Sequence, residues 1–378
     1  PKVGLVLRGG GAKGFAHIGV LKELERSGVQ IDYIAGTSMG AIIGGLYAAG
    51  YSADYIDTVI RETDFSELLQ DVYPRRSIPL FEKEHGEKHA VVLPVNNWKI
   101  GLPQGVSRGK NMLSLLNYLL APLGSLKNFS ELPIPFFCMA TDLETGLAVK
   151  LSDGSLPLAL RASGSFPTLL DPVEVQGKLL VDGGVANNFP IEEMKKIGAD
   201  IIIGVDVQSK LFNKENIKSA IDVLNQISSF EMYEDNSKKI ALTDVYIHPE
   251  IYDYSVVSFD KAEEILDKGE AKAKEFTRVF DSIAALQVVK KKHFKLRQPN
   301  ADFLINKIQL KGVKNYTPAY VLGKLKIAEG DVITNKELKT KIGYLLASGS
   351  FQSVAYHLKS TERGKKLVIN IIENEQDA

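Results

Sequence analysis

A serine between two glycines is the feature of this sequence that most directly suggests chemistry. Ser38 lies in a short turn between an apolar stretch and the apolar segment 41–49. The glycines permit a tight strand-to-helix turn that exposes the serine oxygen, and a helix N-terminus favours developing negative charge nearby. A serine that only caps a helix gives the same pattern, so the turn alone fits a nucleophile and a cap about equally well. The turn consists of Gly36, Thr37, Ser38, Met39 and Gly40.

A glycine-rich run lies upstream of this serine. Residues 8–14 read Arg-Gly-Gly-Gly-Ala-Lys-Gly and follow the predicted strand 2–7. Backbone N–H groups without bulky side chains are what an oxyanion hole requires, and one well-aimed donor contributes ~3 kcal/mol of transition-state stabilisation. The run also fits a dinucleotide-binding turn, but that site needs an acidic residue at the end of the second strand, whereas Asp32 precedes it. A Walker-type phosphate loop is excluded because Lys13 precedes the last glycine.

An aspartate is the best candidate for the base that a serine nucleophile needs. Asp182 directly follows the apolar stretch 179–181 and precedes Gly183 and Gly184, which places a carboxylate at a strand end before a flexible turn. Taken alone, a β-turn aspartate explains this pattern better. None of the six histidines lies in a recognisable loop motif after a strand: His17, His85, His89, His248, His293 and His357.

The elements that must position these residues alternate along the chain. Apolar stretches that suit buried strands are separated by helical patterns, which predicts an α/β layered fold with a largely parallel central sheet. We expect this first domain to span 1–285 and a basic linker to span 286–301. Residues 302–375 follow a β-α-α-β-β order, which describes a small α+β domain. The less regular segment 66–109, with a hairpin pattern around Trp98, is interpreted as a surface hairpin or a cover over an acyl channel.

Composition narrows the class of protein. Forty-six basic residues balance forty-six acidic residues, so we expect no nucleic-acid partner. The single cysteine, Cys138, excludes an intrachain disulfide and a cysteine-based zinc site. No stretch reaches the ~18 consecutive apolar residues of a spanning helix, so we expect the chain as given to be soluble. Because it begins at Pro1, almost directly in a strand, we expect that a targeting segment has been removed.

Four blocks of the sequence, taken together, resemble the patatin-like phospholipases: residues 9–14, 36–40, 162–167 and 182–183. The resemblance implies a three-layer sandwich and a lipid acyl hydrolase that works without a metal or other cofactor. Ser38 would attack a phospholipid or another fatty acyl ester at a membrane surface, and Asp182 would take its proton directly and later activate water. Gly184 stands where alanine is common in that family.

The same resemblance implies roles for the neighbouring residues. The oxyanion donors would be the N–H groups of Gly9, Gly10, Gly11 and Ala12. The turn around Ser38 would form the nucleophile elbow, and Gly183 and Gly184 would form the turn behind the base. Two alternatives stay open: a triad with His248 or His293 as the base, and a chain that mainly binds other polypeptides and carries the first domain as a passenger.

The C-terminal residues 303–374 resemble a polypeptide-transport-associated (POTRA) domain. The resemblance rests on residues 308–312, 330–334, 349–354 and 367–373. It implies a polypeptide partner held by strand addition, or an adjoining outer-membrane β-barrel. We therefore expect an outer-membrane-associated protein of a Gram-negative bacterium, periplasmic or at the cell surface, that resembles the type V autotransporters. The sequence leaves the oligomeric state open.

Overall fold

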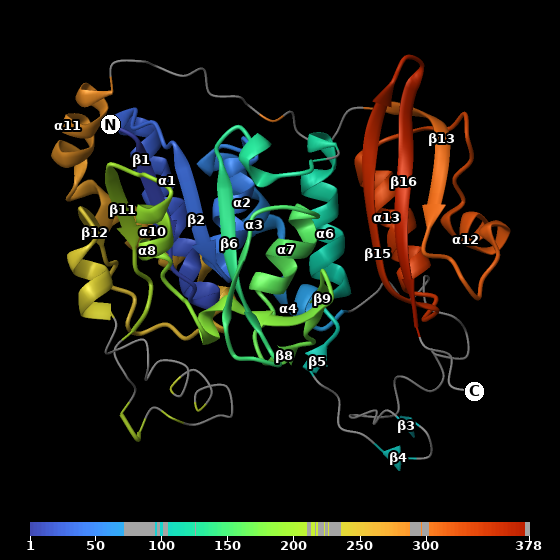
Figure 1. Cartoon of the computed structure of the whole chain (residues 1–378), viewed down its shortest axis with the longest axis horizontal. Coiled ribbons are helices and arrows are strands. Elements are labelled where there is room, and N and C mark those ends of the chain that lie inside the picture. The colour runs from blue at the N-terminus through green and yellow to red at the C-terminus, as the bar shows by residue number, and fades with distance from the viewer. Residues whose placement is uncertain are drawn as a thin grey trace. The chain divides into compact units, whose positions relative to one another are not determined.

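The computed structural model describes residues 1–71, 95–96, 99–100, 105–124, 126–209, 213–215, 217, 223, 226, 236–287, 296 and 302–374. The chain forms two compact units (Figure 1). The first comprises 1–64, 126–167 and 172–296, and the second comprises 65–125, 168–171 and 297–378. Most of the predicted linker 286–301 lies outside the described residues. So does the predicted hairpin around Trp98, apart from a short antiparallel pairing of β3 (Val95–Asn96) with β4 (Lys99–Ile100).

The first unit is built on a mixed sheet with the strand order β12-β11-β1-β2-β6-β10-β9, in which β7 also pairs with β6. The five strands from β12 to β6 are parallel, whereas β10, β9 and β7 are antiparallel to their neighbours. The predicted α/β class with a largely parallel sheet is therefore confirmed. The bounds are β1 (Val3–Leu7), β2 (Tyr33–Thr37), β6 (Phe136–Asp142), β7 (Ala148–Leu151), β9 (Val173–Val175), β10 (Lys178–Asp182), β11 (Ile201–Val205) and β12 (Val245–Ile247).

Helices cover both faces of this sheet because both faces are apolar. Val6, Ala35 and Met139 point to α8, whereas α2 packs against Leu7 and Ile34 on the opposite face. The alternation follows the two-residue period of a strand and gives the three layers that were predicted. The helices are η1 (Gly11–Phe15), α1 (Ala16–Ser27), α2 (Met39–Ala48), α3 (Ala53–Glu62), η4 (Phe129–Glu131), α7 (Leu156–Ser163), η5 (Gly183–Val185), α8 (Ile191–Lys196), η6 (Phe259–Lys261), α10 (Ala262–Lys274) and α11 (Thr277–Leu286).

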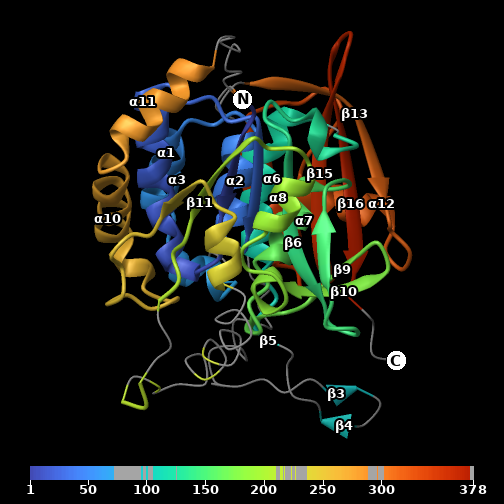
Figure 2. The ribbon, with the colours of Figure 1, turned by 60° about the vertical axis from the view of Figure 1, so that its left-hand side comes forward.

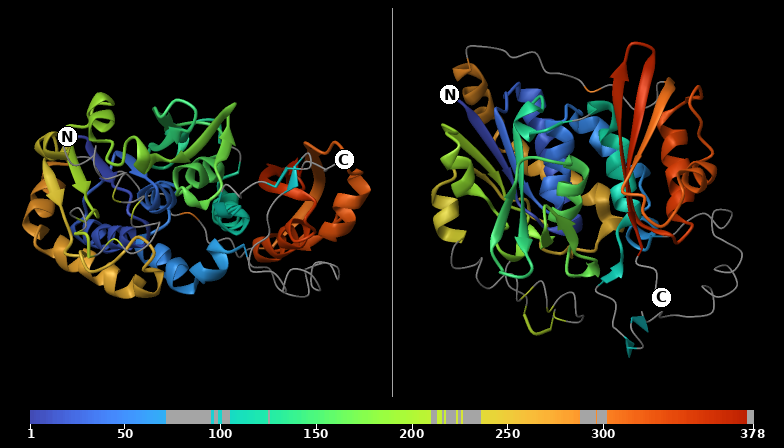
Figure 3. Two further views of the ribbon diagram at one scale, coloured as in Figure 1. Left: turned by 90° about the horizontal axis from the view of Figure 1, so that it is seen from below. Right: turned by 45° about the vertical axis from the view of Figure 1, so that its right-hand side comes forward.

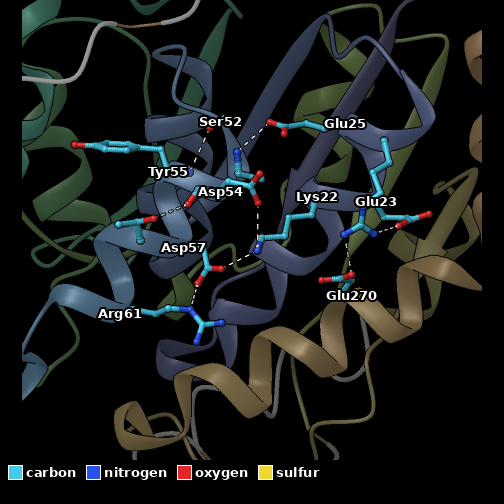
Figure 4. Close-up of polar contacts among 12 residues, drawn as sticks. Lys22, Glu23, Glu25, Ser52, Asp54, Tyr55, Asp57, Arg61 and Glu270 are labelled. Carbon is cyan, nitrogen blue, oxygen red and sulfur yellow. Dashed lines mark hydrogen bonds and ion pairs between the residues drawn. The ribbon is translucent and has the colours of Figure 1, made fainter.

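Charged side chains join the helices α1, α3 and α10, which lie side by side (Figure 2). Lys22 of α1 forms an ion pair of 2.7 Å with Asp57 of α3 (Figure 4). Arg26 of α1 forms an ion pair of 2.8 Å with Glu270 of α10. Such partly exposed pairs contribute little individually, about 0–1 kcal/mol. They match the charges of neighbouring helices, while the buried apolar residues of α1 and α10 supply most of the packing.

The second unit contains a sheet with the strand order β14-β13-β16-β15, flanked by the orange-red helices α12 and α13 (Figure 3). Strands β13 and β16 are parallel, and β15 and β16 form a long antiparallel hairpin. The predicted β-α-α-β-β order is confirmed, with the two-residue strand β14 added. The bounds are α4 (Phe65–Leu69), β5 (Gly105–Ser107), α6 (Lys110–Leu120), η3 (Ala121–Leu123), β8 (Thr168–Leu170), β13 (Phe303–Lys311), α12 (Pro318–Leu325), β14 (Val332–Ile333), α13 (Asn335–Leu346), β15 (Phe351–Thr361) and β16 (Gly364–Glu373).

Helix α6 belongs to this second unit although it lies far upstream in the sequence. The Nζ atom of Lys110 donates to the carbonyl oxygen of Phe351 at 2.5 Å, and Nζ of Lys339 lies 5.2 Å from the ring centre of Tyr118. Ala121, directly after α6, is buried in the core formed by the C-terminal strands and helices. The predicted 302–375 boundary stays a prediction, and the structure adds α6 to the same compact unit. None of the described helices is both long enough and apolar enough to cross a membrane.

Candidate active site

The turn after β2 holds Ser38 in an unusual backbone conformation. Ser38 has φ 54° and ψ −125°, in the region that favours glycine, and α2 begins at the next residue. A residue in such a backbone conformation costs about 1–3 kcal/mol and is held there by the surrounding structure. A Cβ atom at Gly40 would lie 2.2 Å from the carbonyl oxygen of Leu7, so the turn packs directly on the end of β1. The serine hydroxyl is thereby presented at the carboxyl end of the parallel strands.

Asp182 ends the antiparallel strand β10 and faces this serine. The hydroxyl of Ser38 donates to Oδ2 of Asp182 at 2.6 Å, and the N–H of Gly184 donates to Oδ1 at 2.7 Å. The side chain of Thr141 holds the main chain of Asp182 by donating to its carbonyl oxygen at 2.9 Å. The structure thus brings the two predicted residues into direct contact, with Gly183 and Gly184 in the short helix η5 that follows.

Burial sets the basicity of Asp182. The residue is 3% exposed, and this desolvation raises the pKa of its carboxyl from 3.8 to about 6, against the lowering effect of the bonds from Ser38 and Gly184. A pKa near 6 leaves the group ionised at neutral pH yet makes it a stronger proton acceptor than an exposed aspartate.

The glycine-rich run lies beside Ser38, at the end of β1. The N–H of Gly9 donates to the side chain of Asn188 at 3.0 Å, and the N–H of Ala12 donates to the carbonyl oxygen of Val256 at 2.8 Å. Within the described part of the chain, the N–H groups of Gly10 and Gly11 donate to no atom. Of the four predicted donors, these two therefore have N–H groups available for a ligand.

A pocket surrounds the Ser38–Asp182 pair. Its lining includes the glycines 9–11 and the polar residues Asn188 and Gln208. Four apolar residues complete it and would suit a hydrocarbon chain: Phe166, Pro167, Val185 and Val256. The lining residues are Gly9, Gly10, Gly11, Ser38, Phe166, Pro167, Asp182, Gly184, Val185, Asn188, Gln208 and Val256.

Two buried cationic side chains, Arg8 and Lys13, lie before and after the three consecutive glycines 9–11. Arg8 forms an ion pair of 2.7 Å with Asp206, which also accepts from the hydroxyl of Tyr246 and the N–H of Gln208. Lys13 is fully buried, its Nζ donates to Ser209 at 3.1 Å, and burial lowers its pKa to about 8. Each of these charges has an identified partner, as buried charges require.

The histidines near this region have structural partners. A ring nitrogen of His17 bonds to the carbonyl oxygen of Arg8 at 2.7 Å, and burial lowers the pKa of His17 to about 4. His248 bonds to the carbonyl oxygen of Asp206 at 2.9 Å. His293 lies outside the described residues. The hydroxyl of Ser38 donates to Asp182 and not to a histidine.

Sequence reasoning missed three residues that hold the site. Ser163 accepts the N–H of Ser38 at 3.0 Å, and the carbonyl oxygen of Ser165 accepts the N–H of Asp182 at 3.0 Å. Asn188 bonds to both main-chain groups of Gly9. Ser163 and Ser165 lie in the block 162–167 that carries the family resemblance, and their position between the two predicted blocks was the only signal. Among the described residues, no cluster of three His, Cys, Asp or Glu side chains suits a metal ion.

Comparison with known families matches both parts of the chain. Residues 5–195 match the family described as "Patatin-like phospholipase", and residues 303–374 match the POTRA family described as "Surface antigen variable number repeat". An uncharacterized NTE family protein of Mycobacterium bovis is 32% identical over 55% of this chain and 49% of its own length. Lysophospholipase NTE1 of Scheffersomyces stipitis is 30% identical over 71% of this chain and 17% of its own length. The matched part of the chain thus spans half or less of the length of each of these two relatives.

Solved structures with some likeness were also found. VipD from Legionella pneumophila aligns with a TM-score of 0.41 and 16% identity, over 74% of this chain and 67% of its own. The POTRA1-3 part of the periplasmic domain of Omp85 from Anabaena aligns with a TM-score of 0.19 and 18% identity, over 20% of this chain and 31% of its own.

Proposed function

This chain belongs to the patatin-like phospholipase family, and we propose that it hydrolyses fatty acyl esters through a dyad of Ser38 and Asp182. The observation that carries the proposal is the 2.6 Å hydrogen bond from the Ser38 hydroxyl to Oδ2 of Asp182. It aims the nucleophile's proton at a buried carboxylate whose pKa is raised to about 6. No third residue is needed to move that proton.

The first half of the reaction forms an acyl-enzyme. Asp182 takes the hydroxyl proton while Oγ of Ser38 attacks the ester carbonyl carbon, whose π electrons move to the carbonyl oxygen. The N–H groups of Gly10 and Gly11 face this oxygen and stabilise its charge, each by about 3 kcal/mol. We restrict the donor set to these two because the N–H groups of Gly9 and Ala12 already have protein acceptors. The carbon–oxygen bond then breaks, and the leaving alcohol takes the proton from Asp182.

The second half restores the enzyme. Water gives a proton to Asp182 and attacks the acyl carbon of the Ser38 ester, and the same donors hold the second oxyanion. The bond to Oγ breaks, Oγ recovers the proton from Asp182, and the fatty acid leaves. The apolar side chains of Phe166, Pro167, Val185 and Val256 in the pocket support an acyl chain as the bound part of the substrate.

The substrate class that we propose is a phospholipid or lysophospholipid. The match to the patatin-like phospholipases and the likeness to fungal proteins named lysophospholipase support it. Turnover of a fluorogenic medium-chain ester and of a labelled lysophospholipid should be measured for the wild type, Ser38→Ala and Asp182→Asn. We expect activity in the wild type alone. Matched controls are Ser155→Ala and Asp153→Asn, which change the same residue types outside the pocket.

Two other outcomes would reject this proposal. If either dyad variant keeps full activity, the dyad is wrong, and loss of activity in His248→Gln with retained folding would favour a triad. If the folded wild type cleaves neither ester, the result would favour the alternative in which the chain mainly binds other polypeptides and the first domain is a passenger.

For the second unit we propose a polypeptide partner, either a separate chain or an adjoining outer-membrane β-barrel, and a location at the outer membrane. The match of 303–374 to the POTRA family supports this. The sheet edge supports it as well. Strand β14 pairs with β13 only at Phe303 and Leu304, so among the described strands the later residues of β13 have no partner on that side, and an added strand could pair there. Fractionation of the native host, with protease protection to separate periplasm from cell surface, tests the location. Recovery in the cytosolic fraction alone would contradict it.

A further inference from the structure

The side chain of Asn188 makes an unusual two-point contact with the glycine-rich run. Its Oδ1 accepts the N–H of Gly9 at 3.0 Å, and its Nδ2 donates to the carbonyl oxygen of Gly9 at 3.2 Å. Asn188 is 2% exposed and lies 179 positions from Gly9 in the sequence. A single amide therefore satisfies both main-chain groups of one residue, beside the Ser38–Asp182 pair.

Because the peptide unit is planar, the contact of Asn188 with Gly9 also orients part of the next residue, Gly10. The carbonyl of Gly9 and the N–H of Gly10 belong to one planar peptide unit and point in opposite directions. A bond that fixes the Gly9 oxygen therefore fixes the direction of the Gly10 N–H. Glycine populates far more backbone conformations than other residues, so a peptide between two glycines would otherwise rotate easily.

The two available donors differ in how they are held. The carbonyl oxygen of Gly10 accepts the N–H of Lys13 at 3.2 Å, so main-chain structure fixes the peptide that carries the Gly11 N–H. Among the described residues, the peptide that carries the Gly10 N–H is fixed at its oxygen by Asn188. Asn188 also borders the turn behind the base, because a Cβ atom at Gly184 would lie 3.3 Å from its Oδ1.

We propose that Asn188 is a positioning residue that aims the Gly10 N–H at the oxyanion. This inference rests on the proposed hydrolase function and adds a residue to it. Among the described residues the Asn188 side chain bonds to Gly9 and not to Ser38 or Asp182, so its effect passes through the Gly9–Gly10 peptide. Its contribution belongs to the transition state, because the charge on the carbonyl oxygen develops there.

The test compares two identical substitutions on adjacent residues. Asn188→Asp keeps an acceptor for the Gly9 N–H but replaces the donor to the Gly9 oxygen with a second oxygen. Asn187→Asp adds the same charge next to it, where the side chain accepts from Nζ of Lys239 at 3.1 Å and does not contact Gly9. Both variants would be assayed with the fluorogenic ester, and rates would be expressed per folded molecule, with the folded fraction measured by circular dichroism.

We expect Asn188→Asp to lower kcat about 10²–10³-fold with KM changed by less than about threefold, which is the effect of losing one aligned donor. Its affinity for a trifluoromethyl ketone, which forms an oxyanion on attack by serine, should fall in parallel. Asn187→Asp should lose only a few-fold in either measurement. If Asn188→Asp does not fold, Asn188→Ser is used, whose short neutral side chain cannot span both Gly9 atoms.

The outcomes separate this inference from the proposed function. An active wild type, an inactive Ser38→Ala and an Asn188 variant within about threefold of Asn187→Asp would overturn the role of Asn188 and leave the hydrolase intact. A raised KM with unchanged kcat would also overturn it, because substrate binding would then be the step affected. A folded wild type that hydrolyses no ester overturns the proposed function and this inference together.

Discussion

The hydroxyl of Ser163 joins the backbone of Ser38 to the neighbouring strand β6. Its oxygen accepts the N–H of Ser38 at 3.0 Å, and its proton goes to the carbonyl oxygen of Met139 at 2.6 Å. Ser163 is fully buried, and its bond to Met139 is buried as well. The bond from Ser163 therefore helps to hold Ser38 at its positive φ of 54°.

Ser163→Ala should lower both stability and turnover. The change removes two hydrogen bonds, to the Ser38 N–H and to the Met139 carbonyl oxygen, each worth about 0.5–1.5 kcal/mol. It also releases the backbone that aims the nucleophile, so kcat should fall more than KM rises. Urea unfolding and ester turnover measure the two effects. The control is Ser155→Ala in the same helix, which loses only the N-cap of α7, worth about 1 kcal/mol, and should keep its activity. Equal results for the two variants would contradict the role of Ser163.

Activity should depend on pH through Asp182. The proposed base accepts a proton only when ionised, and burial raises its pKa to about 6. We therefore expect kcat/KM to fall about tenfold per pH unit well below 6 and to reach a plateau above about 7. An exposed aspartate would place this transition near pH 4. A pH profile with a neutral ester substrate tests it, and a transition near 4 would show that desolvation does not tune this carboxylate.

Asp182→Asn should produce an inactive but more stable protein at neutral pH. The folded pKa of about 6 exceeds the unfolded value of 3.8, so the folded state holds the proton more tightly and its free energy of unfolding falls as pH rises from about 4 to about 6. The shift corresponds to roughly 3 kcal/mol, which a neutral asparagine avoids. Melting curves at pH 4 and pH 8 should show a gain for the variant at pH 8 that shrinks at pH 4. A variant less stable than wild type at pH 8 would contradict this account.

Asp206→Asn should destabilise the protein strongly. It leaves the guanidinium of Arg8 buried with its ion pair removed, which typically costs about 3–5 kcal/mol. Burial alone would raise the pKa of Asp206, but the charge of Arg8 lowers it, so at the acid end stability is lost as pH falls through this low pKa. Tyr246→Phe, which removes only the hydrogen bond from the Tyr246 hydroxyl to Asp206, is the milder control. Denaturant titration measures the free energy of unfolding of each variant. A loss below about 1 kcal/mol for Asp206→Asn would mean that other groups replace Asp206 as partners of Arg8.

The sequence predicted the parts of the site that are local and missed those that depend on the fold. The turn around Ser38 could be predicted because its glycines and the flanking apolar segments are contiguous. Asn188 and Ser163 act on backbone atoms 179 and 125 positions away, and no spacing rule reports such pairs. The sequence also could not show that the N–H groups of Gly10 and Gly11 are available whereas those of Gly9 and Ala12 are bonded. That distinction depends on which N–H groups find acceptors at Asn188 and Val256.

Helix α6 makes the second unit more than a C-terminal extension. Its neighbours α13 and β15 come from the far end of the chain, and Lys110 and Tyr118 reach across to Phe351 and Lys339. A gene that gained or lost residues 303–374 in one step would have changed what covers the buried side of α6 at the same moment. We therefore expect substitutions on α6 and on α13 to have co-varied during evolution, as substitutions at contacting positions of a single domain do.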